Sequence, residues 1–239
     1  MRSRIRTGSS SPVVVETGGG LFVAKLRGAG HGVSALVSEI IVAELAEQLG
    51  LPVPERVLLE LPEGVPSDDR NDELAQLLEA SVGLNLGFRQ LPGAHDPRPE
   101  DLARVSDEFA GRVLWLDGLV MNPDRSVQNP NILFWKRQPW LIDHGAALPF
   151  QHRWADLTEQ SPREPMDYGR HVFAGRRGLL MALDASLGQS LTRQNVQGAV
   201  AQVPDAFMAV VAPDHDPDRG RALFQTFLWK RLKAPRPFV

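Results

Sequence analysis

A polar loop followed by a short hairpin, within residues 119–145 (LVMNPDRSVQNPNILFWKRQPWLIDHG), restricts the fold of this chain more than any other feature. Asp124 lies in the loop, and Asn129 and Asn131 follow it five and seven residues later. An apolar strand comes next, and after a tight turn a second apolar strand ends in Asp143-His144-Gly145. Because a hairpin returns the chain to its starting point, we expect the carboxylates of Asp124 and Asp143 to share one cleft.

This order of residues is the one in which protein-kinase-like enzymes arrange phosphoryl transfer from Mg-ATP. On this interpretation Asp124 contacts an acceptor hydroxyl and takes its proton, while an asparagine and Asp143 hold Mg²⁺. Asn129 has the usual spacing from the aspartate and Asn131 has the usual place before the strand, so both stay candidates for the metal ligand. Arg125 is a candidate catalytic residue that contacts either the transferred phosphoryl group or the loop of Asp143.

A nucleotide-binding half should precede this loop, and the first 92 residues have the pattern of one. Short β-branched and apolar runs separated by Gly, Ser and Pro predict strands, and two helical patterns lie among them. The longer helix is expected to begin at a serine N-cap, Ser34, and to stop at Gly50. We expect strands at 4–7, 13–16, 21–25, 56–61 and 84–91, the first three in one antiparallel sheet, and helices at 34–49 and 73–80.

Lys25, at the end of the apolar run LFVAK, is the candidate phosphate-binding lysine of that half. The chain has 22 arginines and only four lysines, so a lysine in an apolar strand calls for a specific reason. In kinase-like folds a lysine at this place contacts the α- and β-phosphates, and a carboxylate of the next helix orients it. Glu39 is the best partner because its surroundings are apolar, and Glu44 is the competing candidate.

A small-residue loop lies between the first two expected strands and consists of Gly8, Ser9, Ser10 and Ser11. A kinase keeps the loop that covers the phosphates at this place. Small residues let backbone N–H groups approach phosphate oxygens, and serine hydroxyls add donors. A second glycine-rich stretch at 28–32 is a candidate flap over the nucleotide. The first loop is therefore assigned to nucleotide binding, and the second stays a candidate.

A Pro-, Gly- and Asp-rich stretch at 92–99 divides the chain into an N-lobe at 1–92 and a C-lobe at 93–239. Beyond it a helix is expected at 105–120, and from residue 149 the patterns are mostly helical, ending with a helix at 219–232. The expected fold class is α+β: a bilobal protein-kinase-like fold with a small antiparallel β N-lobe, one main helix and a mostly helical C-lobe.

Composition excludes several other classes of protein. Cysteine is absent, so disulfides, thiolate metal sites and a cysteine nucleophile are excluded. A net charge of −3 argues against direct nucleic-acid binding. No apolar run reaches the roughly 18 residues that a membrane span needs, and the basic N-terminus lacks a signal-peptide core, so we expect a cytoplasmic protein. Four histidines without metal-ligand spacing are expected to be structural or solvated: His95, His152, His171 and His215.

The strings FVAK, DRSVQNPN and LIDHG, together with the helix that carries Glu39, resemble the HipA-like kinase family, which is distantly similar to phosphatidylinositol kinases. The resemblance implies ATP and Mg²⁺ as cofactors and phosphoryl transfer to a hydroxyl-bearing acceptor, a protein serine or threonine. Two departures stand out: Lys25 leaves no room for the N-terminal subdomain of the toxin kinases, and His144 replaces the phenylalanine of many kinases. The alternatives are a pseudokinase scaffold and an AMP transferase.

Overall fold

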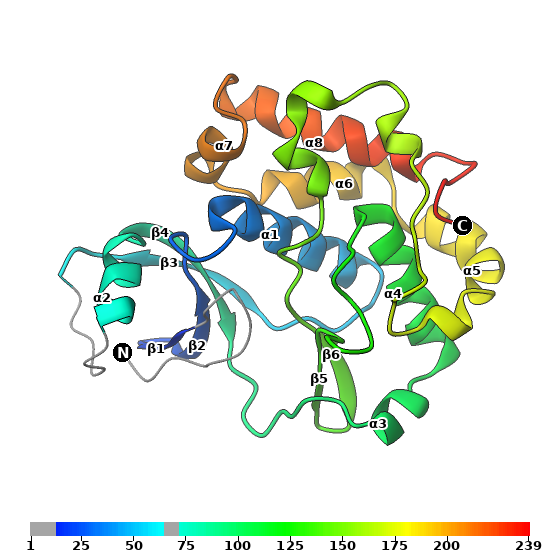
Figure 1. The fold of residues 1–239 in the computed structure, drawn as a ribbon, viewed down its shortest axis with the longest axis horizontal. Coiled ribbons are helices and arrows are strands. Elements are labelled where there is room, and N and C mark those ends of the chain that lie inside the picture. Colours follow the sequence, from blue (N-terminus) through cyan, green and yellow to red (C-terminus); the bar gives the residue numbers. More distant parts are fainter. Residues whose placement is uncertain (1–12, 65–71) are drawn as a thin grey trace.

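A small antiparallel sheet lies beside a larger group of helices in the computed structural model of the chain, which describes residues 13–64 and 72–239 (Figure 1). This arrangement confirms the expected fold class, a β-rich N-lobe with a mostly helical C-lobe. The strand expected at 4–7 and the loop Gly8-Ser9-Ser10-Ser11 lie outside the described residues.

The sheet of the N-lobe has four strands in the order β1-β2-β4-β3, and every neighbouring pair is antiparallel. A glycine-rich turn between Thr17 and Gly20 joins β1 to β2. The pairing sets Lys25 opposite Leu86, so Lys25 projects from the same face as the apolar side chains of β4. The strands are β1 (Val13–Thr17), β2 (Gly20–Lys25), β3 (Arg56–Leu61) and β4 (Gly83–Arg89).

Two helices cover the two faces of this sheet. Helix α1 (Gly32–Gln48) packs on the face of Leu86 and Phe88, which share one hydrophobic core with it. Helix α2 (Asp72–Glu79) packs on the opposite face, where its leucines meet the side chains of β1 and β2. Lys25 therefore points toward α1, the helix that carries Glu39.

The start of α1 differs from the expectation of a serine N-cap. The helix begins at Gly32 and His31 occupies the N-cap position without a side-chain hydrogen bond, so Ser34 lies inside the first turn. A backbone turn replaces the cap: Gly30 and Gly32 have positive φ, and the Gly32 N–H donates to the Ala29 carbonyl at 2.7 Å. The predicted stop is present, since Gly50 follows the helix with φ +70°.

The C-lobe consists of one hairpin and mostly helical segments, as the sequence predicts. Helix α3 was not expected, because Pro99 closes a stretch that reads as a loop. The longest elements are α4, which Ser106 caps through the Phe109 N–H at 3.1 Å, and α8. The elements are α3 (Pro99–Ala103), α4 (Asp107–Val120), β5 (Ile132–Trp135), β6 (Gln138–Leu141), α5 (Leu179–Ser190), α6 (Arg193–Ala201), α7 (Asp205–Val211) and α8 (Pro217–Leu232), with four short 3-10 turns between residues 149 and 176.

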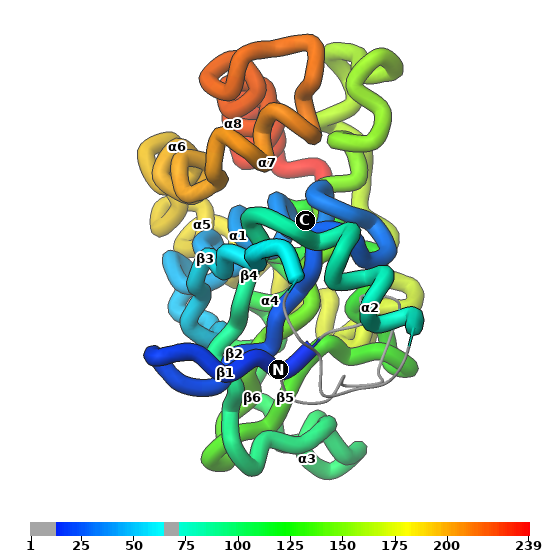
Figure 2. Tube along the Cα trace, turned by 90° about the vertical axis from the view of Figure 1, so that its left-hand side faces the viewer, coloured from blue at the N-terminus to red at the C-terminus, as the bar shows by residue number. Residues whose placement is uncertain are grey.

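Helix α1 lies between the sheet and the C-lobe helices. Figure 2, turned by 90° from Figure 1, shows α7 and α8 on one side of α1 and the hairpin and α3 on the other. The buried side chains of α1 belong to the same hydrophobic core as those of α4, α7 and α8. The main helix of the N-lobe is thus fixed to the C-lobe by apolar packing, which holds Glu39 in place relative to the hairpin. The division between residues 92 and 93 stays a prediction.

The turn of the hairpin has an unfavourable backbone for its residues. Lys136 and Arg137 join β5 to β6 with φ of +50° and +65°. A two-residue hairpin with both φ positive is the turn that favours Asn-Gly, because other side chains are strained in the left-handed region. Nothing in the strand pairing requires lysine or arginine at these positions.

We therefore expect the double variant Lys136→Asn/Arg137→Gly to stabilise the fold by about 1–2 kcal/mol. For a chain of this length the melting temperature should rise by about 3–6 °C, measured by scanning calorimetry. The control Lys136→Ala/Arg137→Ala removes the same charges but keeps both β-carbons. It should melt no higher than the wild type, and an equal rise in both variants would assign the effect to charge.

Candidate functional site

The ammonium of Lys25 joins two carboxylates that are far apart in the sequence. Its Nζ donates to Oε1 of Glu39, fourteen residues on, and to Oδ1 of Asp143 at 2.5 Å. Glu44, the competing candidate, instead forms an ion pair with Arg56 at 2.9 Å. The structure thus brings Lys25 of the sheet, Glu39 of α1 and Asp143 of the hairpin together.

Burial and charge oppose each other in this cluster. Burial disfavours the charged form of Lys25, but the carboxylates of Glu39 and Asp143 outweigh it and raise the pKa of Lys25 above its ordinary value. Burial raises the pKa of Glu39, which is fully enclosed, and the Lys25 ammonium offsets this only in part. Burial also acts against ionisation of Asp143, yet the same ammonium holds the pKa of Asp143 below its usual value. Lys25 and Asp143 are therefore charged at neutral pH.

The hairpin places Asn131 next to Asp143. The Ile142 N–H donates to the Asn131 carbonyl at 3.0 Å, so Asn131 lies across the hairpin from the residue before Asp143. Both residues have left-handed backbones, with φ of +50° for Asn131 and +54° for Asp143. Asn and Asp are, after glycine, the residues that adopt this region most readily, so the sequence suits the backbone at both positions. The backbone thus presents an amide and a carboxylate at the same end of the hairpin.

Asp124 is held by the two asparagines of its loop. Nδ2 of Asn129 and Nδ2 of Asn131 donate to the same Asp124 oxygen, Oδ2, at 3.0 and 3.2 Å. The Asp124 N–H donates to Oδ1 of Asn122 at 3.1 Å, an Asx turn that fixes the start of the loop. Asn131 is buried whereas Asn129 is exposed. Because Asp124 takes their N–H groups, the amide oxygens of both asparagines are the atoms left for other partners.

Lys25, Glu39, Asp124 and Asp143 line a single cleft of about 70 Å³, and neither asparagine is among its described lining residues. Among its described lining residues Lys25 provides the one permanent positive charge, against three carboxyl groups. An excess of oxygen-bearing acids over cations favours a hard divalent ion such as Mg²⁺. The lining residues are Lys25, Leu26, Ala29, His31, Gly32, Ala35, Leu36, Glu39, Asp124, Asp143, Gly145 and Ala146.

Gly145 allows α1 to approach the hairpin closely. A β-carbon at this position would lie 3.1 Å from the Cβ of Ala35 and 3.5 Å from Oε1 of Glu39. The first distance is tighter than ordinary van der Waals contact, so a larger residue would push the helix away. The glycine two residues after Asp143 thus lets the hairpin pack closely against the helix that carries Glu39.

Beneath the loop of Asp124 lies a buried hydrogen-bond network that the sequence pattern did not predict. Its centre is Asp117 of α4, fully buried, whose Oδ2 accepts from Nε of Arg125 at 2.6 Å and from Nε2 of His171 at 3.0 Å. Its Oδ1 accepts from Asn122 at 3.0 Å. His171 is thus structural, as expected. In sequence Asp117 resembles any acidic residue of a helix, and only its apolar neighbours in DEFAGRVLWLDGLV indicate burial.

Arg125 belongs to this network. Its side chain is buried, with 1% of the residue exposed. Besides its bond to Asp117, Arg125 donates to the Asn131 carbonyl at 2.6 Å, and its Nη2 donates to Nδ1 of His144 at 3.2 Å. Of the two contacts considered from sequence, the structure therefore has the one to the loop of Asp143, and the guanidinium lies beneath the cleft. Because it is buried there, Arg125 does not reach the cleft to contact a transferred phosphoryl group. Burial and the Arg125 charge lower the pKa of His144 well below its ordinary value, so His144 is neutral.

The Asp117 network makes acid stability predictable. Burial raises the pKa of Asp117, but Arg125 and His171 outweigh it and lower the pKa to about 2. Because an unfolded aspartate has a pKa of about 4, the stability from ionised Asp117, of order 2 kcal/mol, is complete above about pH 4 and is lost as pH falls toward 2. Chemical denaturation at several pH values should show a drop in this window that is smaller in Asp117→Asn. An equal drop in both proteins would contradict this origin.

The donor set of the cleft fits Mg²⁺. Within the described residues no group of three or more His, Cys, Asp or Glu is placed to hold a metal. An ion at the hairpin would therefore need an amide oxygen beside the Asp143 carboxylate, and Asn131 offers one. Carboxylate and amide oxygens are the ligands that Mg²⁺ prefers, together with water and phosphate.

Comparisons with known proteins identify the family and the fold. A family model described as HipA-like kinase matches residues 1–210. The crystal structure of a proinflammatory kinase, CtkA, from Helicobacter pylori is similar over 96% of this chain and 89% of its own, with a TM-score of 0.60 and 12% sequence identity, which supports the likeness of fold. No curated protein matches the chain. None of the described helices is long and apolar enough to cross a membrane.

Proposed function

The chain belongs to the HipA-like kinase family, and on that premise we propose that it transfers the γ-phosphoryl group of Mg-ATP to a hydroxyl group of a protein acceptor, a serine or threonine. The observation that carries the proposal is the cleft in which Lys25, Glu39, Asp124 and Asp143 meet. A cytoplasmic location fits the proposal because ATP is available there.

Lys25 binds the phosphates in this proposal, and Glu39 keeps its ammonium in position. The Lys25–Glu39 ion pair is buried, so Glu39 and not solvent sets the direction in which the Lys25 side chain points. Mg²⁺, when bound, neutralises the negative charge of the phosphate oxygens. Asp143 and Asn131 would hold that ion, since they lie at the same end of the hairpin. Asn129 supports the loop through its bond to Asp124.

Asp124 orients the acceptor hydroxyl and accepts its proton. The amides of Asn129 and Asn131 donate to one oxygen of Asp124, and the Asp124 side chain lines the cleft. A kinase of this kind acts mainly by positioning the reactants and stabilising charge. Arg125 contributes as a positioning residue: it ties the Asn131 carbonyl and His144 to Asp117, so that the loop of Asp124 and the loop of Asp143 rest on the same support.

The function is tested by comparing ATP labelled at the γ-phosphate with ATP labelled at the α-phosphate. We expect label from the γ position in the protein itself or in a general acceptor such as casein, only with Mg²⁺ and not in Asp124→Asn. Label from the α position would indicate transfer of AMP. Absence of transfer from either nucleotide, with folded protein and several acceptors, would favour the pseudokinase scaffold.

Glu39→Gln should raise the KM for ATP by about 10–100-fold, because the amide cannot form the buried ion pair that orients Lys25. The matched control is Glu44→Gln on the same helix, which loses a pair with Arg56 outside the cleft. Its KM should stay within about twofold of the wild type. Steady-state phosphorylation at varied ATP measures both, and similar values in the two variants would remove Glu39 from the nucleotide site.

A further inference from the structure

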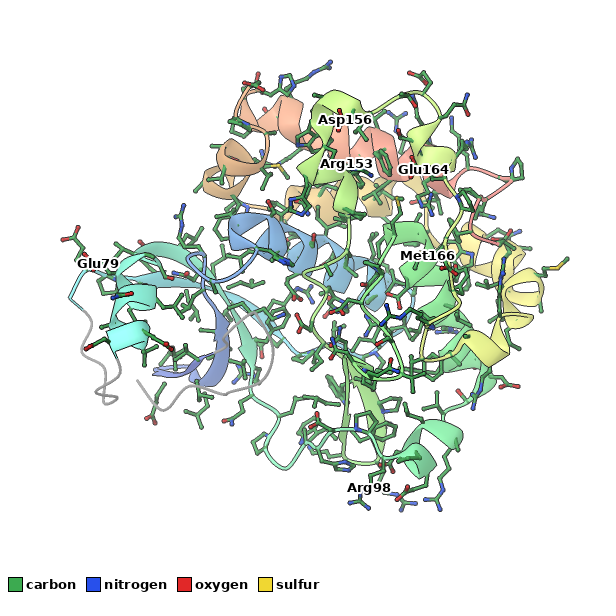
Figure 3. The ribbon with its side chains drawn as sticks, in the orientation of Figure 1. Glu79, Arg98, Arg153, Asp156, Glu164 and Met166 are labelled. Atoms are coloured by element: carbon green, nitrogen blue, oxygen red, sulfur yellow. The ribbon has the colours of Figure 1, made fainter. Side chains whose placement is uncertain are left out.

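A second and larger cavity lies at the far end of the hairpin from the cleft. It has a volume of about 810 Å³ and is bounded by the segment after β4, the start of α4 and the turn between β5 and β6. Figures 1 and 2 both show α3 and the hairpin together at this end of the molecule, and Figure 3 places Arg98 at the same end. We call this cavity the basic groove; the lining residues that matter are His95, Arg104, Phe109, Phe134, Lys136 and Arg137.

The positive charges of the basic groove have no acidic partners among the described residues. Arg104, Lys136 and Arg137 are exposed, and none of them forms an ion pair with an acidic side chain in the part of the chain that the structure describes. Lys136 lies over the ring of Trp135, with Nζ 4.1 Å from its centre. Asp101 is the one carboxylate among the described lining residues, and it accepts from the Arg98 N–H at 3.1 Å. The described lining of the groove therefore carries three permanent cations against one carboxylate.

Two of these charges are kept at strained positions. Lys136 and Arg137 have positive φ, where Asn and Gly would be relaxed, and Lys136 is one of only four lysines in the chain. Backbone strain at exposed positions that no packing requires indicates a functional demand on the side chains. The demand here is for two long cations beside a cavity.

The aromatic residues of the basic groove favour a peptide over a nucleic acid. Phe134 is stacked against His95, with ring centres 6.1 Å apart, and Phe109 packs edge-to-face on Phe173 at 6.4 Å. Nucleic-acid grooves combine basic residues with open aromatic faces on which bases stack, whereas here Phe134 is buried and Phe109 is half-buried, so each ring lines the groove with only part of its surface. With Pro139 they form an apolar floor for aliphatic side chains, flanked by cations for carboxylates.

We propose that the basic groove docks an acidic segment of the protein acceptor, with apolar side chains on the floor and carboxylates on Arg104, Lys136 and Arg137. The acceptor in this statement rests on the proposed function. A four-residue strand spans roughly 13 Å, so the cations of the hairpin turn, Lys136 and Arg137, lie about that far from the end of the hairpin that leads to Asp143. Docking therefore engages a part of the acceptor separate from the hydroxyl that receives the phosphoryl group.

The test measures binding directly by fluorescence anisotropy. The probe is a fluorescein-labelled peptide that alternates Glu with Leu, and its counterpart has Gln for every Glu. We expect the acidic peptide to bind and the Gln peptide to bind at least tenfold more weakly, with affinity falling as salt is raised. Lys136→Asn/Arg137→Gly should weaken binding of the acidic peptide at least tenfold. Because this variant relaxes the turn, the loss cannot come from unfolding.

Two controls complete the experiment. Arg193→Gln/Lys233→Gln removes two exposed charges elsewhere and should bind the acidic peptide like the wild type, whereas Arg104→Gln should bind less well. Unchanged binding in Lys136→Asn/Arg137→Gly, or tighter binding of a labelled oligo-dT through the same residues, would overturn the proposal. Autophosphorylation is followed in parallel. If the peptides bind as expected but neither the wild type nor any variant transfers phosphate, the result supports the basic groove as a binding site and contradicts the proposed kinase function.

Discussion

Replacing Asp143 by asparagine should lower the rate of phosphoryl transfer by about 1,000-fold, the largest effect expected of any substitution in the cleft. Asp143 contacts Lys25 at 2.5 Å, lines the cleft, and lies at the same end of the hairpin as Asn131. Asparagine keeps the shape of the side chain but removes the charge that would hold a divalent cation and balance the ammonium. Transfer of γ-labelled phosphate under saturating Mg-ATP measures the loss.

The fold should tolerate this change. The Asp143 side chain is 37% exposed, and Lys25 keeps its buried partner Glu39. The melting temperature of Asp143→Asn should therefore stay within about 3 °C of the wild type. Asp214→Asn, at an exposed loop position, is the matched control and should keep full activity. Near-normal transfer by Asp143→Asn in the presence of Mg²⁺ would remove this residue from the mechanism.

Asp117→Asn should have the largest effect on stability, a loss of about 3–5 kcal/mol. Asp117 and Arg125 are both fully enclosed, and the substitution leaves the guanidinium charge buried without its counter-charge. For a chain of this length the melting temperature should fall by roughly 6–15 °C, measured by scanning calorimetry. Activity should fall as well, since Arg125 supports both loops of the cleft.

An exposed ion pair provides the comparison for Asp117. Asp205 pairs with Arg221 but its side chain is 75% exposed, so Asp205→Asn should cost less than about 1 kcal/mol. A stability loss in Asp117→Asn no larger than that of Asp205→Asn would show that the buried network does not support the fold. A normal melting temperature with lost activity would instead make Asp117 important for the reaction alone.

The loop of Asp124 and the hairpin after it could be predicted because their information is local. Asp124, the asparagines and Asp143 lie within one short stretch, and a tight turn between two apolar strands leaves few ways to fold it. Lys25 and Glu39 were also accessible, since both interrupt apolar runs in elements that must pack together. In each case a polar residue in an apolar context required a partner, and few partners were available.

The features that could not be predicted depend on contacts between distant segments. Asp117 and His171 meet across 54 residues, and neither has a distinctive neighbourhood in sequence. The burial of Arg125 follows from that meeting, so the sequence left its role open. Ser34 resembled an N-cap, but the backbone turn at Gly30 and Gly32 started the helix earlier. The basic groove arises only where the hairpin turn approaches α4.

The most direct test of the central claim is a crystal structure with Mg²⁺ and a non-hydrolysable ATP analogue. A cleft of about 70 Å³ is smaller than ligand sites of a nucleotide's size, so the Lys25–Asp143 contact should open on binding. We expect the phosphates at Lys25, and the ion at Asp143 and Asn131, with Asp124 facing the γ-phosphate. Nucleotide bound elsewhere, or an ion that does not contact Asp143, would contradict the proposed site.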